Sequence, residues 1–356
     1  MSRRHCVLGL MSGSSLDGLD LALCSFTARS DQGWDWQILE AETRTFSRAW
    51  RNRLTAAPRL PAAELADLHV HFGRYLGEEA RAFLDHKRTA QVPDALASHG
   101  HTVFHAPERG YSLQIGHGAY LAQAAGLPVV CDFRSADLAA GGQGAPLAPV
   151  ADKWLFPAYG AYLNLGGIAN VSIPRAGSWL GFDVTACNQL LNALAAEAGK
   201  PFDESGKLAA SGKLLPDLLR QLNAASFFDQ RPPKSLSNSW VREVLVQPAL
   251  AFPAAPADKL HTACRHVAAQ VGRALAGPEG RLLVTGGGAH NDFLLACLAE
   301  ALPALVVRKP GTQVIEFKEA LLMAFMGALF AQGSPNTLPA VTGARRAVVA
   351  GAYHRP

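Results

Sequence analysis

The segment CVLGLMSGSSLDGLDLALC, residues 6–24, decides how the rest of the chain is interpreted. Its two apolar ends flank a polar turn rich in glycine and serine, which predicts a strand, a turn and a second strand. The pattern returns in the second half as AYLNLGGIANVSI, residues 161–173, where Gly166 and Gly167 occupy the turn. A strand–glycine turn–strand unit at the start of each half predicts a duplicated fold.

Helix and strand patterns alternate through the remainder of the chain. Long stretches with helical periodicity predict helices, and short apolar runs that end in glycine or polar residues predict strands. The main predicted helices are 61–88, 118–125, 188–198, 211–223, 258–276, 291–302 and 316–331, and further predicted strands are 95–98, 113–116, 129–133 and 281–285. Mixed elements in this order predict an α/β protein.

The length of the chain predicts two lobes, because 356 residues exceed the usual size of a single domain. We expect the first lobe to comprise residues 1–137, completed by the C-terminal segment 327–356, and the second lobe to comprise residues 138–326. The glycine-rich segment 141–146 is the predicted hinge between them.

The composition argues against several classes of protein. Apolar residues make up 49% of the chain and charged residues 17%, which predicts a large core. The net charge is +4 and the basic residues form no stripe, so we expect no nucleic-acid partner. The longest strongly apolar run, 320–331, is too short for a membrane span of about twenty residues, so we expect no membrane association. Six cysteines without a CxxC pair predict a reduced, cytoplasmic protein.

Three glycine-rich turns, at residues 11–18, 165–170 and 285–292, directly follow predicted strands. Glycine lets backbone N–H groups approach phosphate oxygens, because no Cβ intrudes. One such turn is often an ordinary hairpin, but three of them favour phosphate binding. The sequence contains neither GxxxxGK[ST] nor a GxGxxG that opens a helix. Asp17 in the first turn can hold Mg²⁺ through water or cap the turn with its side chain.

These turns resemble the two phosphate loops and the adenosine loop of the actin, hexokinase and Hsp70-type ATPases. Within that superfamily the chain resembles the anhydro-N-acetylmuramic acid kinases. The motifs that match the family's pattern, in order, are GLMSGSSLDGLD, SHGHTVFHAP, LQIGHGAYLA, PVVCDFR, AAGGQGAPLAP, LNLGGIANVS, GFD, TGGGAHN and LPAVTGA. They extend from Gly9 to Ala344, and nine motifs in order are highly specific.

The resemblance implies a two-lobed actin/hexokinase-like (ribonuclease H-like) duplicated fold with a central cleft. It also implies an ATP-dependent kinase of peptidoglycan recycling, which opens the 1,6-anhydro ring of its sugar with water and yields N-acetylmuramic acid 6-phosphate. The aspartate of the GFD element, Asp183, would be the catalytic base that takes a proton from the water. A different interpretation of Asp183 is a cap of the helix predicted nearby.

The resemblance assigns further site residues and the cofactors ATP and Mg²⁺. Asp17 would hold the magnesium ion, and the planar fork of Arg134 suits the lactyl carboxylate of the sugar. The implied nucleotide-binding residues are Gly13, Ser14, Ser15, Leu16, Asp17, Gly18, Leu19, Asp20, Gly166, Gly167, Gly286, Gly287, Gly288 and Asn291. The implied substrate-binding residues are His99, Gly100, His101, Arg134, Asn188 and Glu319.

The sequence departs from the family's pattern at three places. Val184–Cys187 replace a glycine–proline–glycine turn, so we expect the backbone to take a different path there. His101 stands where the family has glutamine, and Phe317 and Lys318 precede Glu319 in place of the usual residues. Cys187 suits packing better than nucleophilic catalysis, since phosphate transfer from ATP needs no covalent step.

Other interpretations stay open at this stage. The chain can be a kinase of another amino sugar on the same fold, or a nucleotide-dependent binding protein. His99, His101 and His105 also have a spacing that zinc can use, although no fourth ligand is evident nearby. The expected partners are a small sugar and ATP, and a homodimer is one option for the oligomeric state.

Overall fold

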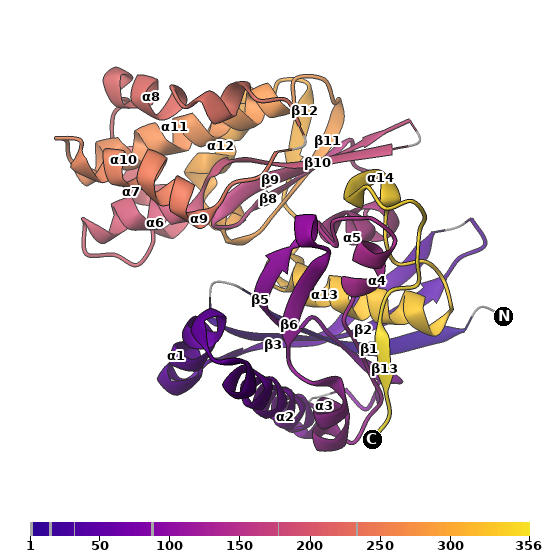
Figure 1. The fold of residues 1–356 in the computed structure, drawn as a ribbon. Coiled ribbons are helices and arrows are strands. Elements are labelled where there is room, and N and C mark those ends of the chain that lie inside the picture. Colours follow the sequence, from indigo (N-terminus) through magenta and orange to yellow (C-terminus); the bar gives the residue numbers. More distant parts are fainter. Residues whose placement is uncertain (1–2, 14–15, 32, 87–88, 177, 233) are drawn as a thin grey trace. The chain divides into compact units, whose positions relative to one another are not determined.

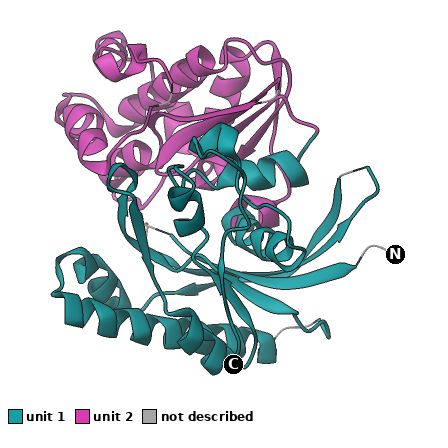
Figure 2. Cartoon of the chain, turned by 45° about the vertical axis from the view of Figure 1, so that its right-hand side comes forward, with its two compact units in different colours: residues 1–157, 317–356 teal, residues 158–316 magenta. Residues whose placement is uncertain are grey.

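The computed structural model describes residues 3–13, 16–31, 33–86, 89–176, 178–232 and 234–356. The chain forms two compact units, which Figure 2 shows in different colours. Unit 1 contains residues 1–157 and 317–356, and unit 2 contains residues 158–316. None of the helices in the described part of the chain is long and apolar enough to cross a bilayer.

Unit 1 is built on a six-stranded sheet with the order β13-β7-β4-β1-β2-β3. The strands β1, β2 and β3 form an antiparallel meander, whereas β4 and β7 run parallel to β1. Their bounds are β1 Arg4–Ser12, β2 Gly18–Ala28, β3 Trp34–Thr45, β4 Ala95–Ser98, β7 Val129–Cys131 and β13 Ala352–His354. A separate hairpin consists of β5 His101–Ala106 and β6 Tyr111–Ile115.

Helices pack against both faces of this sheet (Figure 1). Leu8 and Leu10 of β1 join the core beneath α2 and α3, while Gly9 between them meets the backbone of α13. A side chain at Gly9 would collide with that backbone, so this glycine lets α13 pass close over β1. The helices are α1 Arg48–Ala56, α2 Ala62–His86, α3 Gly118–Ala125, α4 Ser135–Ala139, α5 Ala148–Leu155, α13 Thr312–Ala331 and α14 Pro339–Thr342.

Unit 2 is built on a five-stranded sheet with the order β10-β9-β8-β11-β12. Its bounds are β8 Ala161–Leu165, β9 Ile168–Arg175, β10 Ser178–Ala186, β11 Gly280–Thr285 and β12 Leu305–Arg308. Its helices are α6 Asn188–Ala196, α7 Lys207–Ser211, α8 Pro216–Asn223, α9 Asn238–Trp240, α10 Gln247–Ala251, α11 Pro256–Ala274 and α12 Asp292–Ala301. Buried aliphatic side chains of the sheet and of α6, α11 and α12 form one core.

The two sheets have the same topology. In each unit the first three strands form an antiparallel meander, and the next two run parallel to the first strand. The orders β3-β2-β1-β4-β7 and β10-β9-β8-β11-β12 are therefore equivalent, and β13 is an addition to unit 1. The duplicated ribonuclease H-like α/β fold that the sequence predicts is confirmed.

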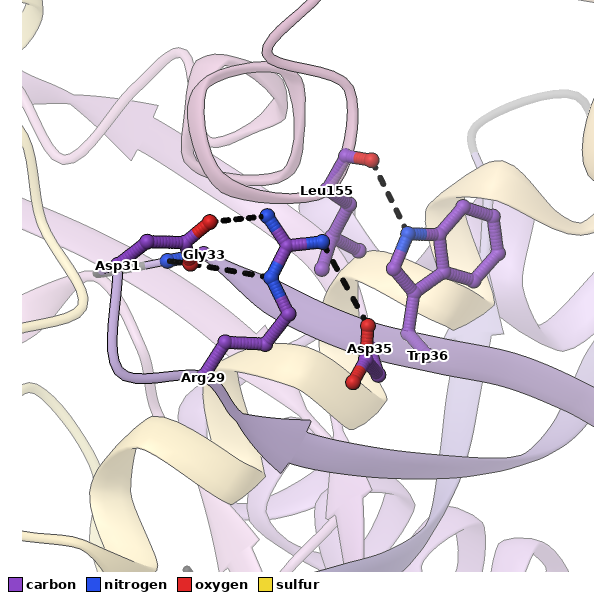
Figure 3. A network of polar contacts seen from close by, with 6 residues as sticks. All are labelled: Arg29, Asp31, Gly33, Asp35, Trp36 and Leu155. Carbon is purple, nitrogen blue, oxygen red and sulfur yellow. Dashed lines mark hydrogen bonds and ion pairs between the residues drawn. The ribbon is translucent and has the colours of Figure 1, made fainter.

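The unit boundaries differ from the sequence-based division at 137/138 and 326/327, because α5 and most of α13 belong to unit 1. The indole Nε1 of Trp36 on β3 donates to the carbonyl oxygen of Leu155 at the end of α5, at 3.0 Å (Figure 3). The same hairpin is closed by Arg29, which pairs with Asp31 and Asp35. The contact between Trp36 and Leu155 joins residues far apart in the sequence, so no local pattern predicts that α5 belongs to unit 1.

The predicted hinge at 141–146 does not coincide with either passage between the units, which lie at 157/158 and 316/317. The Gly144 N–H donates to the buried carboxylate of Asp137 at 2.8 Å. The Gln143 N–H donates to the carbonyl oxygen of Thr342 at 2.8 Å. The segment is thus fastened inside unit 1, and the hinge prediction is wrong.

Candidate active site

Two glycine turns of unit 2 lie at the ends of neighbouring parallel strands. Gly166 and Gly167 follow β8, and Gly286 follows β11, with Asn164 paired to Thr285 in the ladder. Gly286 has a φ of +81°, and a Cβ there would lie 2.6 Å from the Asn164 side-chain oxygen. Only glycine fits this position without strain. The duplicated sheet therefore brings both predicted turns to one edge of unit 2.

Asn188, predicted to bind substrate, links the turn after β8 to the start of α6. Its backbone N–H donates to the Gly166 carbonyl oxygen, and its side-chain Nδ2 donates to the Leu165 carbonyl oxygen, both at 3.0 Å. Because the peptide bond is trans, the Gly166 carbonyl that faces α6 turns the Gly167 N–H away from it. The side chain of Asn188 thus holds the shape of the turn.

The glycines of the third turn differ in how much space surrounds their Cα atoms. A Cβ at Gly287 would meet only the Asn188 side chain, at 3.5 Å, whereas a Cβ at Gly288 would lie 2.7 Å from Leu165. Asn291 is buried, and its side-chain oxygen accepts the Leu294 N–H at 2.9 Å as the N-cap of α12. Gly287 therefore borders free space, while Asn291 serves helix α12.

Asp183 lies on β10, not at the start of a helix. A β-bulge separates Asp183 from Thr185 in the pairing with β9, and a bulge often re-aims a side chain. The Leu236 N–H donates to Asp183 Oδ2 at 2.9 Å, and the Asp183 N–H donates to the Lys234 carbonyl oxygen at 3.0 Å. The helix-cap interpretation is wrong, because Cys187 is the N-cap residue of α6.

The environment of Asp183 suits a carboxylate that exchanges protons. Its side chain is half-buried, and burial raises the pKa of the carboxyl above its ordinary value of 3.8, partly offset by the Leu236 N–H. Burial disfavours the charged form, and a backbone donor favours it. The group is therefore more basic than an ordinary aspartate while one of its oxygens stays fixed.

The divergent segment 184–187 continues β10 to Ala186 and is buried. Burial raises the pKa of the Cys187 thiol to about 12, so this group stays protonated and is no nucleophile. The segment packs into the core of unit 2 through Val184, Ala186 and Cys187.

The first glycine turn joins β1 to β2 in unit 1, and Ser14 and Ser15 lie outside the described residues. Leu16 has a φ of +60°, which is unusual for a residue with a branched side chain. Leu19 is fully buried, so its side chain belongs to the core. Asp17 is exposed, and Asp20 accepts a hydrogen bond from Thr43 Oγ1 at 2.6 Å.

His99 and Arg134 form a buried pair in unit 1. The Arg134 Nε and Nη2 atoms lie 3.1 and 2.8 Å from His99 Nε2, and Nη1 donates to the Gly144 carbonyl oxygen at 2.7 Å. His99 Nδ1 lies 3.1 Å from the Gly100 carbonyl oxygen, which fixes the proton on Nδ1. Burial, with the charge of Arg134, lowers the pKa of His99 to about 3. His99 is thus a neutral acceptor that orients the guanidinium.

Arg134 keeps part of its fork for a ligand. A guanidinium has five N–H groups, and the contacts above use one each on Nε, Nη1 and Nη2. One N–H on each terminal nitrogen stays available for a further acceptor such as a carboxylate oxygen. Zinc binding at His99 is disfavoured, because the unprotonated nitrogen Nε2 already accepts hydrogen bonds from Arg134. Among the described residues, no group of three or more His, Cys, Asp or Glu side chains could hold a metal ion.

His101 connects the neighbourhood of His99 to the last residue of β1, just before the first glycine turn. Its Nδ1 lies 3.1 Å from the hydroxyl of Ser12, the last residue of β1. Burial lowers the pKa of His101, partly offset by Ser12. The residue that replaces the family's glutamine therefore still offers a neutral hydrogen-bonding group at this place.

Several charged side chains lie around Glu319 in unit 1. Among them is an ion pair between Lys318 and the buried Asp152, which the sequence did not predict. Lys318 Nζ lies 2.6 Å from the buried carboxylate of Asp152. The side chain of Glu319 is exposed, but many protein atoms surround its carboxylate. These surroundings and the charge of Asp20 raise the pKa of Glu319, while the charges of Lys318 and Arg134 lower it. The predicted residues Asp20, Arg134 and Glu319 are therefore electrostatic neighbours.

The predicted residues thus form two groups, one in each unit. The unit 1 group consists of the first glycine turn with His99, Gly100, His101, Arg134 and Glu319. The unit 2 group consists of Gly166, Gly167, Asp183, Asn188 and the turn 286–288. Most members of each group follow the ends of strands of their own sheet, whereas Glu319 lies on α13 and Asp183 lies within β10.

Comparisons with known proteins cover nearly the whole chain. The profile of the family "Anhydro-N-acetylmuramic acid kinase" matches residues 5–356. Anhydro-N-acetylmuramic acid kinase from Pseudomonas putida KT2440 is 37% identical over 98% of both chains, and the one from Nitrosospira multiformis is 34% identical over 98% of both chains. A solved structure, an activator of 2-hydroxyisocaproyl-CoA dehydratase from Clostridium difficile with bound ADPNP, has a TM-score of 0.46 and 14% identity, covering 92% of this chain and 97% of that one. The two relatives align with this chain from end to end.

Proposed function

The chain belongs to the anhydro-N-acetylmuramic acid kinase family, and on that premise we propose that its two groups of site residues divide one reaction between them. The chain is an ATP-dependent sugar kinase, and its acceptor is anhydro-N-acetylmuramic acid. Unit 2 supplies the base and two phosphate-facing turns. Unit 1 supplies a third turn and the residues that recognise the sugar.

The reaction joins a hydrolysis to a phosphate transfer. Water adds to the anomeric carbon, the bond from that carbon to the sixth oxygen breaks, and the freed oxygen takes the γ-phosphoryl group of ATP. The products are N-acetylmuramic acid 6-phosphate and ADP. Because the attacking water must lose a proton, a base has to lie beside it.

Asp183 is the proposed base, and its environment is the observation that carries the proposal. Burial raises the pKa of its carboxyl, so the carboxylate binds a proton more readily than an ordinary aspartate. The Leu236 N–H fixes Oδ2, which leaves Oδ1 for the water. The alternative role as a helix cap is excluded by its position on β10.

Arg134 is the proposed partner of the lactyl carboxylate. Its two available N–H groups and its hydrogen bonds with His99 and Gly144, which hold the guanidinium in place, support this role. Burial lowers the pKa of Arg134 to about 10, so the side chain remains a cation at neutral pH. A fixed cation that does not need to reorganise is well suited to bind an anionic substrate.

The glycine turns are the proposed phosphate contacts. The open space beside Gly287 and the outward Gly167 N–H support backbone contacts to phosphate oxygens. Asn188 supports this role by holding the turn at Gly166 through two hydrogen bonds.

Magnesium is the proposed companion of ATP. The exposed carboxylate of Asp17 and the neighbouring carboxylates of Asp20 and Glu319 are oxygen donors of the kind that Mg²⁺ accepts, directly or through water. The carboxylates of Asp20 and Glu319 repel each other, and a cation bound beside them together with ATP would relieve this repulsion. The ion would neutralise phosphate charge when bound.

We place the reaction in the cytoplasm, where ATP is available.

The experiment that tests this function uses ¹⁸O-water. The chain is incubated with anhydro-N-acetylmuramic acid, ATP and Mg²⁺, and the product is analysed by mass spectrometry. We expect one ¹⁸O at the anomeric carbon and a phosphate on the sixth oxygen. A product without label, or with label on the phosphate, would contradict the proposed chemistry.

A further inference from the structure

A pocket of unit 2 gathers positive charge outside the site described above. Arg175, Arg231, Lys234 and Arg273 all line this pocket, which has a volume of ≈ 450 Å³. They come from the end of β9, from the segment that precedes α9 and from the end of α11. Segments far apart in the sequence thus bring four cations to one concave place.

The pocket lies on the face of β10 opposite the proposed base. Leu180, Phe182 and Val184 contribute to its lining, whereas Asp183 does not. Successive side chains of a strand point to opposite faces, so Asp183 and its neighbour Phe182 face different surroundings. This cavity is therefore separate from the carboxylate that would contact water and sugar.

The charges in the pocket are poorly balanced. No carboxylate is among its lining residues in the described part of unit 2, and Arg273 pairs with a carboxylate outside the lining, that of Asp229, at 2.9 Å. Lys234 Nζ donates to the Phe227 carbonyl oxygen at 3.0 Å, and burial together with the charge of Arg273 lowers the pKa of Lys234. Cations held this close together favour an anion as their partner.

We propose that this pocket is a second binding site, for a small molecule that carries a phosphate monoester, and that its occupancy acts on Asp183. Arginine forks and a lysine suit the phosphate, because they offer both two-bond and point-charge contacts. The apolar side chains of β10 suit the carbon skeleton of the same molecule. Inorganic phosphate alone would fill little of ≈ 450 Å³, whereas a phosphorylated monosaccharide fits this scale.

The action on Asp183 passes through one short segment. Lys234, which lines the pocket, accepts the Asp183 N–H with its carbonyl oxygen at 3.0 Å. Two residues later the Leu236 N–H donates to Asp183 Oδ2 at 2.9 Å. An anion that draws Lys234 toward itself would therefore change the hydrogen bond that fixes the carboxylate. This second half of the proposal rests on the proposed role of Asp183 as the base.

Calorimetric titration tests binding independently of catalysis. The full chain, saturated with a non-hydrolysable ATP analogue, is titrated with N-acetylmuramic acid 6-phosphate, with inorganic phosphate and with unphosphorylated N-acetylmuramic acid. The test variant is Arg175→Glu/Arg231→Glu, both at exposed positions of the pocket. The control is Lys200→Glu/Arg242→Glu, which makes the same charge change at exposed positions of unit 2 outside the pocket.

We expect the sugar phosphate to bind best and the test variant to lose at least about tenfold in affinity, with the control unchanged. Equal losses in both variants would show unspecific attraction and overturn the site. Full binding in the test variant would place the anion in the active site, with the same consequence. Tighter binding of inorganic phosphate than of the sugar phosphate would overturn the proposed class of ligand.

The pH profile of kcat/KM tests the action on Asp183. With the sugar phosphate bound in the pocket, we expect the acid limb of the profile to move in the wild type and to stay in place in Arg175→Glu/Arg231→Glu. An unmoved limb despite proven binding would overturn the coupling alone. If Asp183 proves not to be the base, the calorimetric result still decides whether the site exists.

Discussion

Equivalent strands of unit 1 and unit 2 end in different chemistry. The fourth strand of unit 1, β4, ends at Ser98 and leads into His99, whereas its counterpart β11 ends at Thr285 and leads into Gly286. The third strand of unit 2, β10, carries Asp183, whereas its counterpart β3 carries none of the predicted site residues. The same topology therefore presents charged and hydrogen-bonding side chains in unit 1 and mainly glycine backbone in unit 2.

The difference shows what a duplicated fold determines and what it leaves free. Strand order fixes where the chain turns, so both units have a glycine turn after their first strand. The side chains at those ends decide which ligand each unit can recognise. We infer that unit 1 recognises the anionic sugar through Arg134, and that unit 2 contributes the base and backbone contacts to phosphate.

The largest expected effect is a loss of activity when the base proposed for unit 2, Asp183, is replaced. Asp183→Asn keeps an oxygen to accept the Leu236 N–H but removes the basic carboxylate. We expect kcat to fall by about 10²–10⁴-fold while ATP affinity stays nearly unchanged. Steady-state kinetics and nucleotide titration measure the two quantities.

The stability of Asp183→Asn provides its control. Because burial raises the pKa of Asp183 in the folded chain, ionisation at neutral pH costs folding free energy. This cost is absent below the ordinary pKa of 3.8 and grows as the pH rises through the raised value. The neutral variant should thus unfold at the same or a higher temperature at pH 7. Lower activity with a lower melting temperature would indicate a folding defect instead.

The next effect sharpens the role of unit 1. Arg134→Gln should lower kcat/KM for anhydro-N-acetylmuramic acid by roughly ten- to a hundredfold, because a charge-assisted contact is worth about 1.5–3 kcal/mol. The same variant should lose much less on an analogue without the lactyl group, since the carboxylate is missing there. Comparing both proteins on both substrates separates the contact between Arg134 and the lactyl carboxylate from the structural contacts of Arg134 with His99 and Gly144. Equal losses on both substrates would remove Arg134 from carboxylate recognition.

A smaller effect separates two neighbouring glycines of unit 2. Gly287→Val places its side chain in open space, so we expect a folded variant with a KM for ATP raised by about tenfold. Gly286→Val meets a φ of +81° and the Asn164 side chain, and it should mainly lower the melting temperature. An unchanged KM in Gly287→Val would contradict a nucleotide contact at this turn.

The sequence predicted the features that depend on local pattern. The sequence showed the glycine turns after strands, the helices 118–125 and 258–276 and the repeated strand–turn–strand unit, because these follow from periodicity and turn chemistry. The bulged strand β10 was missed, since the pattern around Asp183 does not alternate regularly. The Asp152–Lys318 pair gave no signal, because tertiary packing alone brings these residues together.

Family motifs named the residues around both glycine turns, but they did not reveal what each side chain does. Asn188 and Asn291 are polar residues beside predicted loops, and both were assigned to ligands. The structure shows that Asn188 bonds a turn carbonyl and that Asn291 caps α12. A sequence pattern records that a polar group is needed at a position, whereas its partner depends on which segments meet there.

The smallest expected effect compares two buried histidines, one in each unit. Burial lowers the pKa of both His99 and His266 to about 3, from an ordinary value of 6.5. Below pH 6.5 the unfolded chain therefore binds one more proton at each histidine than the folded chain, so stability falls as the pH drops toward 3. His266→Gln removes one of these protons and should flatten the slope of unfolding free energy against pH by up to about 1.4 kcal/mol per pH unit. Urea unfolding at several pH values between 5 and 7 measures this slope, and His71→Gln, at an exposed position, is the control. A slope that is unchanged in His266→Gln would contradict the lowered pKa of His266, whose cause is its burial.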